Sequence, residues 1–210
     1  YGDHRDLHSF PTRRSSDLCN LGRAAFPHLN FICADFDEYN TVKKYDAILF
    51  GDVLEHHQDI RSAITKAKTL LTKNGIILVT IPTDEDVYEK NDSDGGHISA
   101  LTKAQWEELG GHIRFSSNGI FDWFFIVLPA VDSNNLLGKK LEDLVDEEGF
   151  LLSYPSSFDP FFRQQYRAPY TDKGTTHSYL GMYDKILKPI QNSAENILEI
   201  GIFKGGSIVL

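Results

Sequence analysis

The stretch from Tyr45 to Pro82 constrains the fold more than any other part of the sequence. It opens with an apolar run, YDAILF, which Gly51 closes, and it ends with a second apolar run, IILVTI, before Pro82. Between the two runs, residues 60–71 carry apolar side chains three and four positions apart, the spacing of one helical face. Because both runs are continuously apolar, they predict parallel strands covered on both faces, and hence an α/β fold with a mostly parallel sheet.

Shorter patterns predict the elements around this unit. Asn74-Gly75 is expected to end the central helix, because glycine readily takes the left-handed conformation of a helix cap. The run Ile120–Val131 suits either a helix or a strand, and its periodicity does not decide between them. The other predicted elements are strands at Asn30–Ala34, His112–Ser116 and Asn196–Ile200, and helices at Thr102–Leu109, Leu136–Glu148 and Tyr179–Ile190.

The composition is that of a folded, acidic protein. The chain has 210 residues, 41% of them hydrophobic and 12% aromatic, which is enough for a packed core. Its formal net charge of −9 would repel a phosphate backbone, so we expect no binding to long nucleic acid. No apolar run reaches the roughly 20 residues that span a bilayer. The two cysteines lack metal-ligand spacing, which indicates reduced thiols and a cytoplasmic setting.

Residues 1–18, YGDHRDLHSFPTRRSSDL, differ from the rest of the chain. They follow neither hydrophobic period and lack the apolar stretch of a signal peptide. Their sequence matches the translation of one reading frame of a common sequencing-library adapter. We therefore expect the segment to be non-native and the native sequence to begin inside a domain at Cys19; a basic, disordered arm is the alternative.

Three sequence blocks resemble, in order and spacing, class I S-adenosylmethionine-dependent methyltransferases. They are CADF at Cys33–Phe36, YDAILFGDVLEH at Tyr45–His56 and LLTKNGIILVTIP at Leu70–Pro82. The resemblance implies a Rossmann-like sheet and the cofactor S-adenosylmethionine, with Asp35 contacting the adenine amino group. Asp35 and Phe36, and likewise Gly51 and Asp52, follow predicted strands, where open parallel sheets bind their ligands. The alternative is that the two aspartates only cap turns or helices.

The C-terminal part resembles the start of macrocin-type sugar O-methyltransferases. The matching segments are TDKGTTHSYLGMY at Thr171–Tyr183 and NILEIGIFKGGS at Asn196–Ser207. The resemblance implies that a glycine-rich turn binds the methionyl carboxylate of the cofactor, through close backbone approach and free amides at a helix N-terminus. The residues of this turn are Glu199, Gly201, Gly205 and Gly206. An ordinary strand-to-helix turn is the alternative.

These resemblances predict four segments along the chain. They are the non-native segment 1–18, a partial methyltransferase domain without its first strands at 19–152, a linker at 153–170 and the start of a second methyltransferase domain at 171–210. In this division Asn196–Ile200 begins a sheet of its own. The alternative is a permuted arrangement, which we do not expect, in which this strand folds back to replace the missing first strand.

A possible metal site combines Asp52, Glu55, His56 and His97. Their order resembles the acid-x-x-Glu-His…His arrangement of metal-dependent RNA-end and ubiquinone-pathway O-methyltransferases. Oxygen and nitrogen ligands of this kind suit a divalent ion such as Mg²⁺, which can polarise an attacking hydroxyl. The alternative is that Glu55 and His56 only begin a helix and His97 only fixes a loop.

We therefore expect part of a methyltransferase that acts on a small molecule or sugar, by O-methylation. The sequence identifies no catalytic residue, although His56 and His97 are candidate bases. Because the first strands of the domain are missing, we predict that the chain is inactive or nearly so. Two alternatives remain: an NAD-binding Rossmann oxidoreductase or epimerase, and a non-catalytic scaffold with a methyltransferase-like fold.

Overall fold

The structure, a computed structural model, describes residues 19–20, 22–24, 27–84, 97–117, 122–130, 135–136, 139–140 and 186–201. Five strands of these residues form one sheet: β1 (Tyr45–Gly51), β2 (Leu71–Pro82), β3 (His112–Ser117), β4 (Asp122–Pro129) and β7 (Ile197–Ile200). Two shorter strands, β5 (Asn135–Leu136) and β6 (Lys139–Lys140), pair with each other. The helical elements are η1 (Leu54–His56), α2 (Ile60–Leu70), α4 (Lys103–Glu108) and η2 (Lys188–Ile190).

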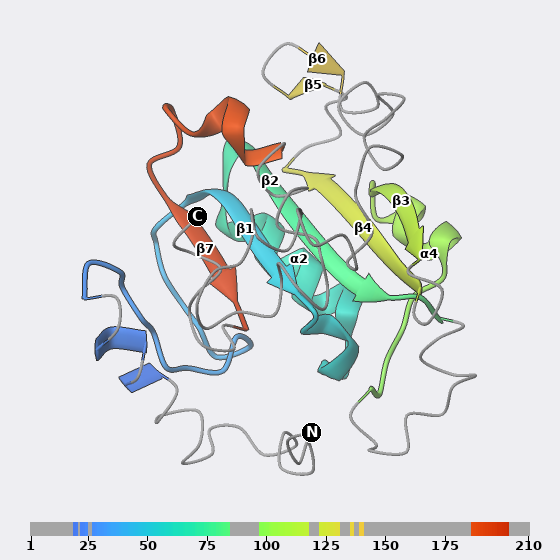
Figure 1. Ribbon diagram of the computed structural model, residues 1–210, viewed down its shortest axis with the longest axis horizontal. Helices are drawn as coiled ribbons and strands as arrows, with labels where there is room; N and C mark the ends of the chain where they lie inside the picture. Colours follow the sequence, from blue (N-terminus) through green and yellow to red (C-terminus); the bar gives the residue numbers. More distant parts are fainter. Residues whose placement is uncertain are drawn as a thin grey trace, which may run out of the picture.

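The strands of the main sheet lie in the order β3-β4-β2-β1-β7 (Figure 1). β1 pairs in parallel with β2 on one side and with β7 on the other, whereas β4 is antiparallel to both β2 and β3. β3 therefore runs in the same direction as β2, and β4 alone of these five strands is reversed. This mostly parallel α/β sheet confirms the predicted Rossmann-like fold class.

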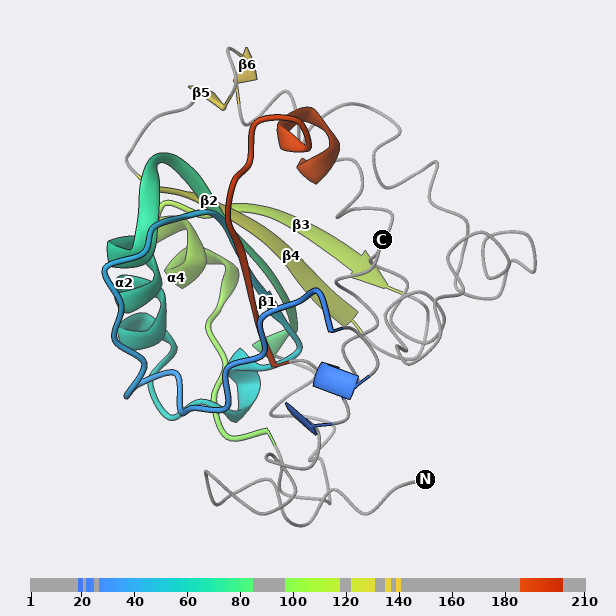
Figure 2. The same cartoon turned by 90° about the vertical axis from the view of Figure 1, so that its left-hand side faces the viewer.

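Helices α2 and α4 lie on the same face of the sheet (Figure 2). α2 begins after Asp59, whose carboxylate accepts a hydrogen bond from the amide of Ser62 at 3.0 Å. α4 begins with a capping box between Thr102 and Gln105. The predicted apolar face of α2 packs against the sheet in one core, in which each fully buried aliphatic side chain contributes roughly 1.5–3 kcal/mol. This core includes Ile48, Phe50, Ile60, Ala63, Ile64, Ala67, Leu70, Ile77, Val79, Ile126 and Leu128.

The predicted end of the central helix is wrong by several residues. α2 ends at Leu70, β2 begins directly at Leu71, and Asn74-Gly75 lies inside the strand. A Cβ on Gly75 would stand 2.8 Å from the carbonyl oxygen of Tyr45, so the glycine lets two strands approach closely instead of capping a helix. Its own carbonyl accepts a hydrogen bond from the amide of Ala130 at 2.9 Å.

The predicted strand at Asn30–Ala34 is also absent, because this run joins no neighbouring strand. Phe31 alone of its large apolar residues is buried, and Ile32 is 43% exposed. The carbonyl of Phe31 accepts a hydrogen bond from Arg23 at 2.8 Å, and its ring packs over Gly22. The run therefore covers the preceding segment rather than extending the sheet.

Two ambiguous regions further along the chain are settled by strand pairing. Within Ile120–Val131, residues 122–129 form β4 and pair with strands on both sides. The helix predicted at Leu136–Glu148 is wrong for its described residues, because Leu136 lies in β5 and Lys139–Lys140 form β6. Among the described residues, no helix has the length and apolar character needed to cross a membrane.

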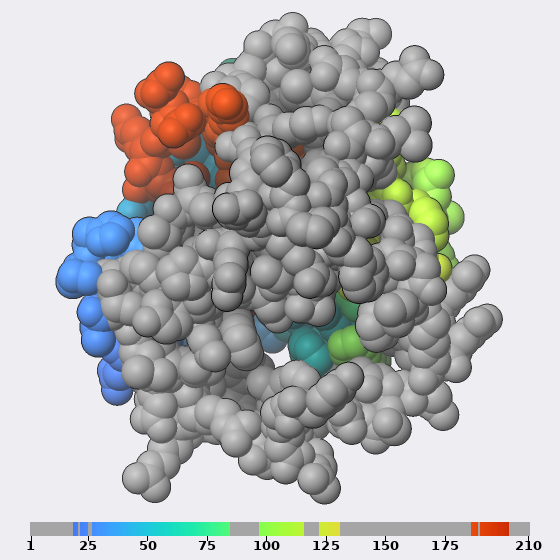
Figure 3. Space-filling model, in the orientation of Figure 1, coloured from blue at the N-terminus to red at the C-terminus, as the bar shows by residue number. Residues whose placement is uncertain are grey.

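β7 is an edge strand of the main sheet, beside β1. The two strands are in register from Ala47 with Ile197 to Phe50 with Ile200. The expectation that Asn196–Ile200 begins a separate sheet is therefore wrong, because its backbone completes the hydrogen bonding of β1. In the space-filling view, residues 186–201 lie along one side of the molecule, opposite α4 and β3 (Figure 3). Residues 1–18, 153–170 and 202–210 lie outside the described residues, and the division into domains stays a prediction.

Candidate functional site

Strands β1, β2 and β7 end at the same edge of the sheet, because they run in parallel. Phe50 of β1 lies beside Ile200 of β7, and Gly51 lies beside Thr80 of β2. The turn after β1 and the turn after β7 are therefore neighbours. Open α/β sheets bind ligands at this edge, beyond the carboxyl ends of their strands.

Asp52 holds a left-handed backbone conformation in the turn after β1. Its φ of 52° is uncommon for any residue other than glycine, although aspartate tolerates it better than most. Its amide donates a hydrogen bond to the carbonyl of Thr80 at 3.0 Å, and the Thr80 hydroxyl donates to Oδ1 of Asp52 at 3.4 Å. Because Thr80 is fully buried in β2, these contacts fix the turn and direct the Asp52 carboxylate towards β2.

The 3₁₀ helix η1 follows this turn and is bound to the segment that precedes α4. The amides of Ile98 and Ser99 donate hydrogen bonds to the carbonyl of Glu55 at 2.8 and 3.2 Å. The hydroxyl of Ser99 donates to the carbonyls of Leu54 and His57. These bonds join residues more than 40 positions apart, and they place His97 next to η1.

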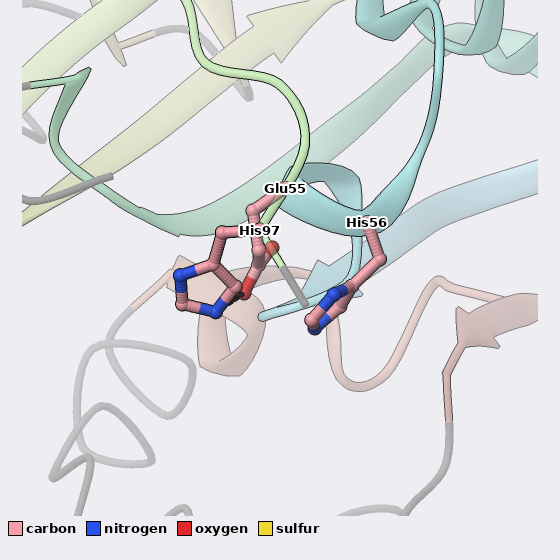
Figure 4. Close-up of side chains that lie close together, drawn as sticks. All are labelled: Glu55, His56 and His97. Atoms are coloured by element: carbon pink, nitrogen blue, oxygen red, sulfur yellow. Dashed lines mark ion pairs between the residues drawn. The ribbon is translucent and has the colours of Figure 1, made fainter. Parts of the chain in front are cut away.

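Glu55, His56 and His97 form a cluster beyond the carboxyl end of β1 (Figure 4). Glu55 and His56 come from η1, and His97 comes from the segment before α4. One ligand atom from each residue lies within 4.8 Å of the others, and Nε2 of His97 is 4.0 Å from Oε1 of Glu55. The imidazole rings of His56 and His97 have their centroids 5.0 Å apart. Glu55 is only 1% exposed, whereas the two histidines are partly exposed.

This cluster offers one oxygen and two nitrogen ligands. Donor atoms around an ion with bonds of about 2.1 Å lie at most about 4.2 Å apart, so side-chain shifts of roughly 1 Å would close the cluster around a metal. The structure brings together three of the four predicted metal ligands. The described metal-type cluster does not include Asp52, whose carboxylate faces Thr80.

Asp35 and Phe36 lie in a turn beside β1 rather than at the end of a strand. The Phe36 ring meets the Phe50 ring edge-on, with centroids 5.4 Å apart, and Nζ of Lys66 lies 5.5 Å from its centre. Oδ1 of Asp35 accepts a hydrogen bond from the amide of Asp37 at 2.8 Å, a capping contact within its own turn. Phe36 thus lies next to the end of β1, and Asp35 shows the capping role that the sequence left as an alternative.

The sequence gave no indication of an ion pair between His57 and Asp37 near this edge. Nε2 of His57 lies 3.1 Å from both carboxylate oxygens of Asp37. Nδ1 of His57 accepts a hydrogen bond from the amide of Asp59 at 3.1 Å, which places the ring proton on Nε2. The pair joins the Asp35–Asp37 turn to the residues before α2. Its partners are 20 positions apart, so no local motif could have revealed it.

The turn after β7 contains the described part of the predicted glycine motif. Leu198 and Ile200 pack against the core on the face that α2 covers, so Ile197 and Glu199 face the opposite side. Gly201 has a φ of 79°, and a Cβ there would lie 2.0 Å from Cγ2 of Val53. Glycine is therefore required where the end of β7 meets the turn after β1. Gly205 and Gly206 lie outside the described residues.

Comparison with known proteins gives partial matches to solved methyltransferase structures. No family model matches the chain, and no curated protein sequence matches it. N-methyltransferase NodS from Bradyrhizobium japonicum WM9 is 15% identical, with a TM-score of 0.39, over 51% of this chain and 64% of NodS. The DhpI-SAM-HEP complex gives 14% identity and a TM-score of 0.40, over 51% of this chain and 61% of DhpI.

An O-methyltransferase family protein from Burkholderia thailandensis is 16% identical, with a TM-score of 0.40, over 56% of this chain and 41% of that protein. This chain thus spans less than two thirds of each of these three proteins. The likeness concerns part of the backbone, and the fold assignment rests on the strand order of the sheet.

Proposed function

We propose that this chain carries the S-adenosylmethionine-binding part of a methyltransferase that methylates a hydroxyl of a small molecule or sugar. The observation that carries the proposal is the meeting of two sequence motifs at one edge of the sheet. The methyltransferase-like block Tyr45–His56 ends beside the glycine turn that begins at Glu199. Both turns lie where a parallel α/β sheet binds its ligand.

In this proposal the residues around the end of β1 hold the adenosine part of the cofactor. Gly51 allows the ligand to approach the backbone, and Phe36 supplies an apolar wall against Phe50. Asp35 and Asp52 supply carboxylates for exocyclic amines or hydroxyls. Glu199 and Gly201 hold the methionine part, as the sequence resemblance implies, with Gly205 and Gly206 as further predicted contacts.

The reaction is a direct displacement at the sulfonium methyl group. The acceptor oxygen forms a bond to the methyl carbon, the carbon–sulfur bond breaks, and S-adenosylhomocysteine leaves. Alignment of acceptor and methyl group supplies much of the rate. The acceptor proton passes to a base, for which His56 and His97 are the candidates, because both lie beyond the end of β1.

A divalent metal at Glu55, His56 and His97 is a further element of the proposal. Such an ion would polarise the acceptor hydroxyl and favour its ionised form. The donor set of two imidazoles and one carboxylate suits zinc, iron or another transition metal better than Mg²⁺, which prefers oxygen ligands. We therefore replace the Mg²⁺ expected from the sequence by a transition metal.

Calorimetric titration of the full chain with S-adenosylhomocysteine tests this proposal, with NADH titrated in parallel. We expect saturable binding of S-adenosylhomocysteine and none of NADH. Binding of NADH instead would favour the oxidoreductase alternative, and binding of neither ligand would favour a non-catalytic scaffold. Transfer of labelled methyl groups to sugar hydroxyls is a separate measurement, and the predicted lack of turnover stays a prediction.

A further inference from the structure

We infer that the end of β7 and the end of β1 build one ligand site in this chain, rather than parts of two sites in two domains. The inference rests on the proposed function for the identity of the ligand, an S-adenosylmethionine-type molecule. It departs from the sequence-based division, in which the C-terminal glycine turn serves a second domain. Three sets of contacts carry it.

The first set fixes the entry to β7. Oδ2 of Asp46 accepts hydrogen bonds from the amides of Glu195 and Asn196 at 2.8 and 3.1 Å. The amide of Asp46 in turn donates to the carbonyl of Asn196 at 2.8 Å. Thr72 orients the carboxylate through a hydrogen bond to Oδ1 at 3.1 Å. Hydrogen bonds to a charged group contribute more than neutral ones, so this side chain sets where β7 begins.

The second set fixes the register between the strands. Ala47, Ile48, Leu49 and Phe50 pair in sequence with Ile197, Leu198, Glu199 and Ile200. Leu198 and Ile200 add to the core that β1 and α2 share. A slip by one residue would turn these two side chains to the other face and bring Glu199 towards the core, so a single register is favoured.

The third set fixes the exit from β7. Gly201 packs so closely on Val53 that a Cβ would lie 2.0 Å from Cγ2 of that side chain. Its φ of 79° turns the backbone in a direction that other residues rarely take. Val53 directly follows Asp52 and precedes η1. The glycine turn therefore begins in contact with the turn that carries Gly51 and Asp52.

Entry, register and exit together place the ends of two sequence-distant segments side by side. Asp46 and Asn196 are separated by 150 positions, and neighbouring strands lie about 4.8 Å apart. A ligand that combines a nucleoside with an amino acid is long enough to contact both strand ends at once. One site therefore receives its adenosine contacts from β1 and its methionine contacts from β7.

The test compares S-adenosylhomocysteine binding by the full chain and by the variant Gly201→Val, with circular dichroism to confirm folding. We expect at least tenfold weaker binding by the variant, because a side chain at this position cannot stay against Val53. Glu107→Gln is the matched surface control, since Glu107 makes only an exposed contact of 3.7 Å with Lys103 on α4. It should bind as the unmodified chain does.

A disulfide-locked variant keeps the test decisive if Gly201→Val fails to fold. Ala47→Cys and Ile197→Cys join paired positions of β1 and β7, in a background with Cys19 and Cys33 changed to serine. Neither paired position belongs to the proposed binding residues. We expect the oxidised form to bind S-adenosylhomocysteine as tightly as the reduced form.

The possible outcomes separate the inference from the proposed function. If the unmodified chain binds no S-adenosylhomocysteine, both are overturned. If it binds and Gly201→Val binds within twofold of it, the one-site inference alone is overturned. If the reduced disulfide variant binds but the oxidised one does not, β7 does not lie beside β1 in the liganded protein, and the inference is again overturned. Weaker binding by Gly201→Val together with binding by the oxidised variant supports it.

Discussion

Asp46 and Asn196 exchange two hydrogen bonds across 150 positions of sequence. The amide of Asp46 donates to the carbonyl of Asn196 at 2.8 Å, and Oδ2 of Asp46 accepts from the amide of Asn196 at 3.1 Å. One residue of β1 thus binds the segment that leads into β7 through both its backbone and its side chain. This contact links the methyltransferase-like block of the sequence to its C-terminal glycine motif.

Asp46→Ala should destabilise the chain by about 1–3 kcal/mol, because it removes hydrogen bonds to a charged acceptor. Burial acts to raise the pKa of Asp46, but hydrogen bonds from the amides of Asn196 and Glu195 and from Thr72 outweigh it and lower the pKa. The ionised carboxylate therefore stabilises the folded state above the unfolded-state pKa of about 3.9. This contribution is lost as the pH falls through the lower, folded-state value.

Urea unfolding at pH 7 and at pH 3 measures this effect. The difference in unfolding free energy between the unmodified chain and Asp46→Ala should shrink at the lower pH. Glu107→Gln, an exposed carboxylate change, should alter stability by less than about 0.5 kcal/mol at either pH. An Asp46→Ala variant as stable as the control at pH 7 would contradict the proposed role of this carboxylate.

A double-mutant cycle tests the contact between Gly201 and Val53. Gly201→Ala should cost about 2 kcal/mol or more, from its left-handed φ and from the clash with Cγ2 of Val53. Val53→Ala removes the clashing atom, so the double variant should be more stable than the sum of the single changes predicts, by about 1 kcal/mol. Additive unfolding free energies would mean that the two residues do not touch.

Tyr45 should give the chain a distinct loss of stability in alkali. Burial, followed by the hydrogen bond to Tyr39, raises the pKa of Tyr45 to about 12. The two hydroxyl oxygens lie 2.7 Å apart, and Tyr45 is 4% exposed. The contribution of the neutral phenol is complete below the unfolded-state pKa of about 10 and is lost as the pH rises towards 12.

Unfolding of Tyr45→Phe between pH 9 and pH 12 checks this prediction. The variant should lose about 1 kcal/mol at pH 9 with the hydrogen bond, and it should then fall less steeply than the unmodified chain. Tyr39→Phe is the matched control, because it removes the same hydrogen bond but leaves the Tyr45 phenol buried. If Tyr45→Phe and the unmodified chain declined in parallel, ionisation of Tyr45 would not be the cause.

The cluster of Glu55, His56 and His97 should bind Zn²⁺ in preference to Mg²⁺, because it offers two nitrogen ligands. Calorimetric titration with each metal alone measures the preference. His97→Ala should weaken Zn²⁺ binding at least tenfold. His57→Ala changes the neighbouring histidine, which is paired with Asp37, and should leave binding unchanged. Equal losses in both variants, or none in His97→Ala, would rule out this cluster as the zinc site.

The sequence predicted the parts of the fold that depend on local pattern. The apolar runs at β1 and β2 and the helical face of α2 are buried as expected, because each forms the centre of the sheet or packs on it. The equally apolar run at Asn30–Ala34 forms no strand, since it has no strand to pair with. Gly75 indicated a helix end but serves a close approach to Tyr45, a contact that periodicity does not encode.

The candidate site shows the same limit. The motif at Glu55 and His56 predicted a cluster with His97, and the backbone bonds of Ile98 and Ser99 to Glu55 explain why His97 lies there. The position of β7 could not be predicted, because its partner strand lies 150 residues earlier and many pairings suit a short apolar run. The permuted arrangement was considered from the sequence and set aside, and the contacts of β7 now favour it.

Disulfide formation between β1 and β7 tests the central claim most directly. In the full chain with Cys19 and Cys33 changed to serine, the pair Ala47→Cys and Ile197→Cys occupies paired positions. The pair Ala47→Cys and Glu195→Cys is displaced by two residues and should have Cα atoms about 8 Å apart, beyond disulfide reach. The account predicts a rapid, intramolecular disulfide in the first pair and little in the second. Equal cross-linking of both pairs, or none in the first, would contradict it.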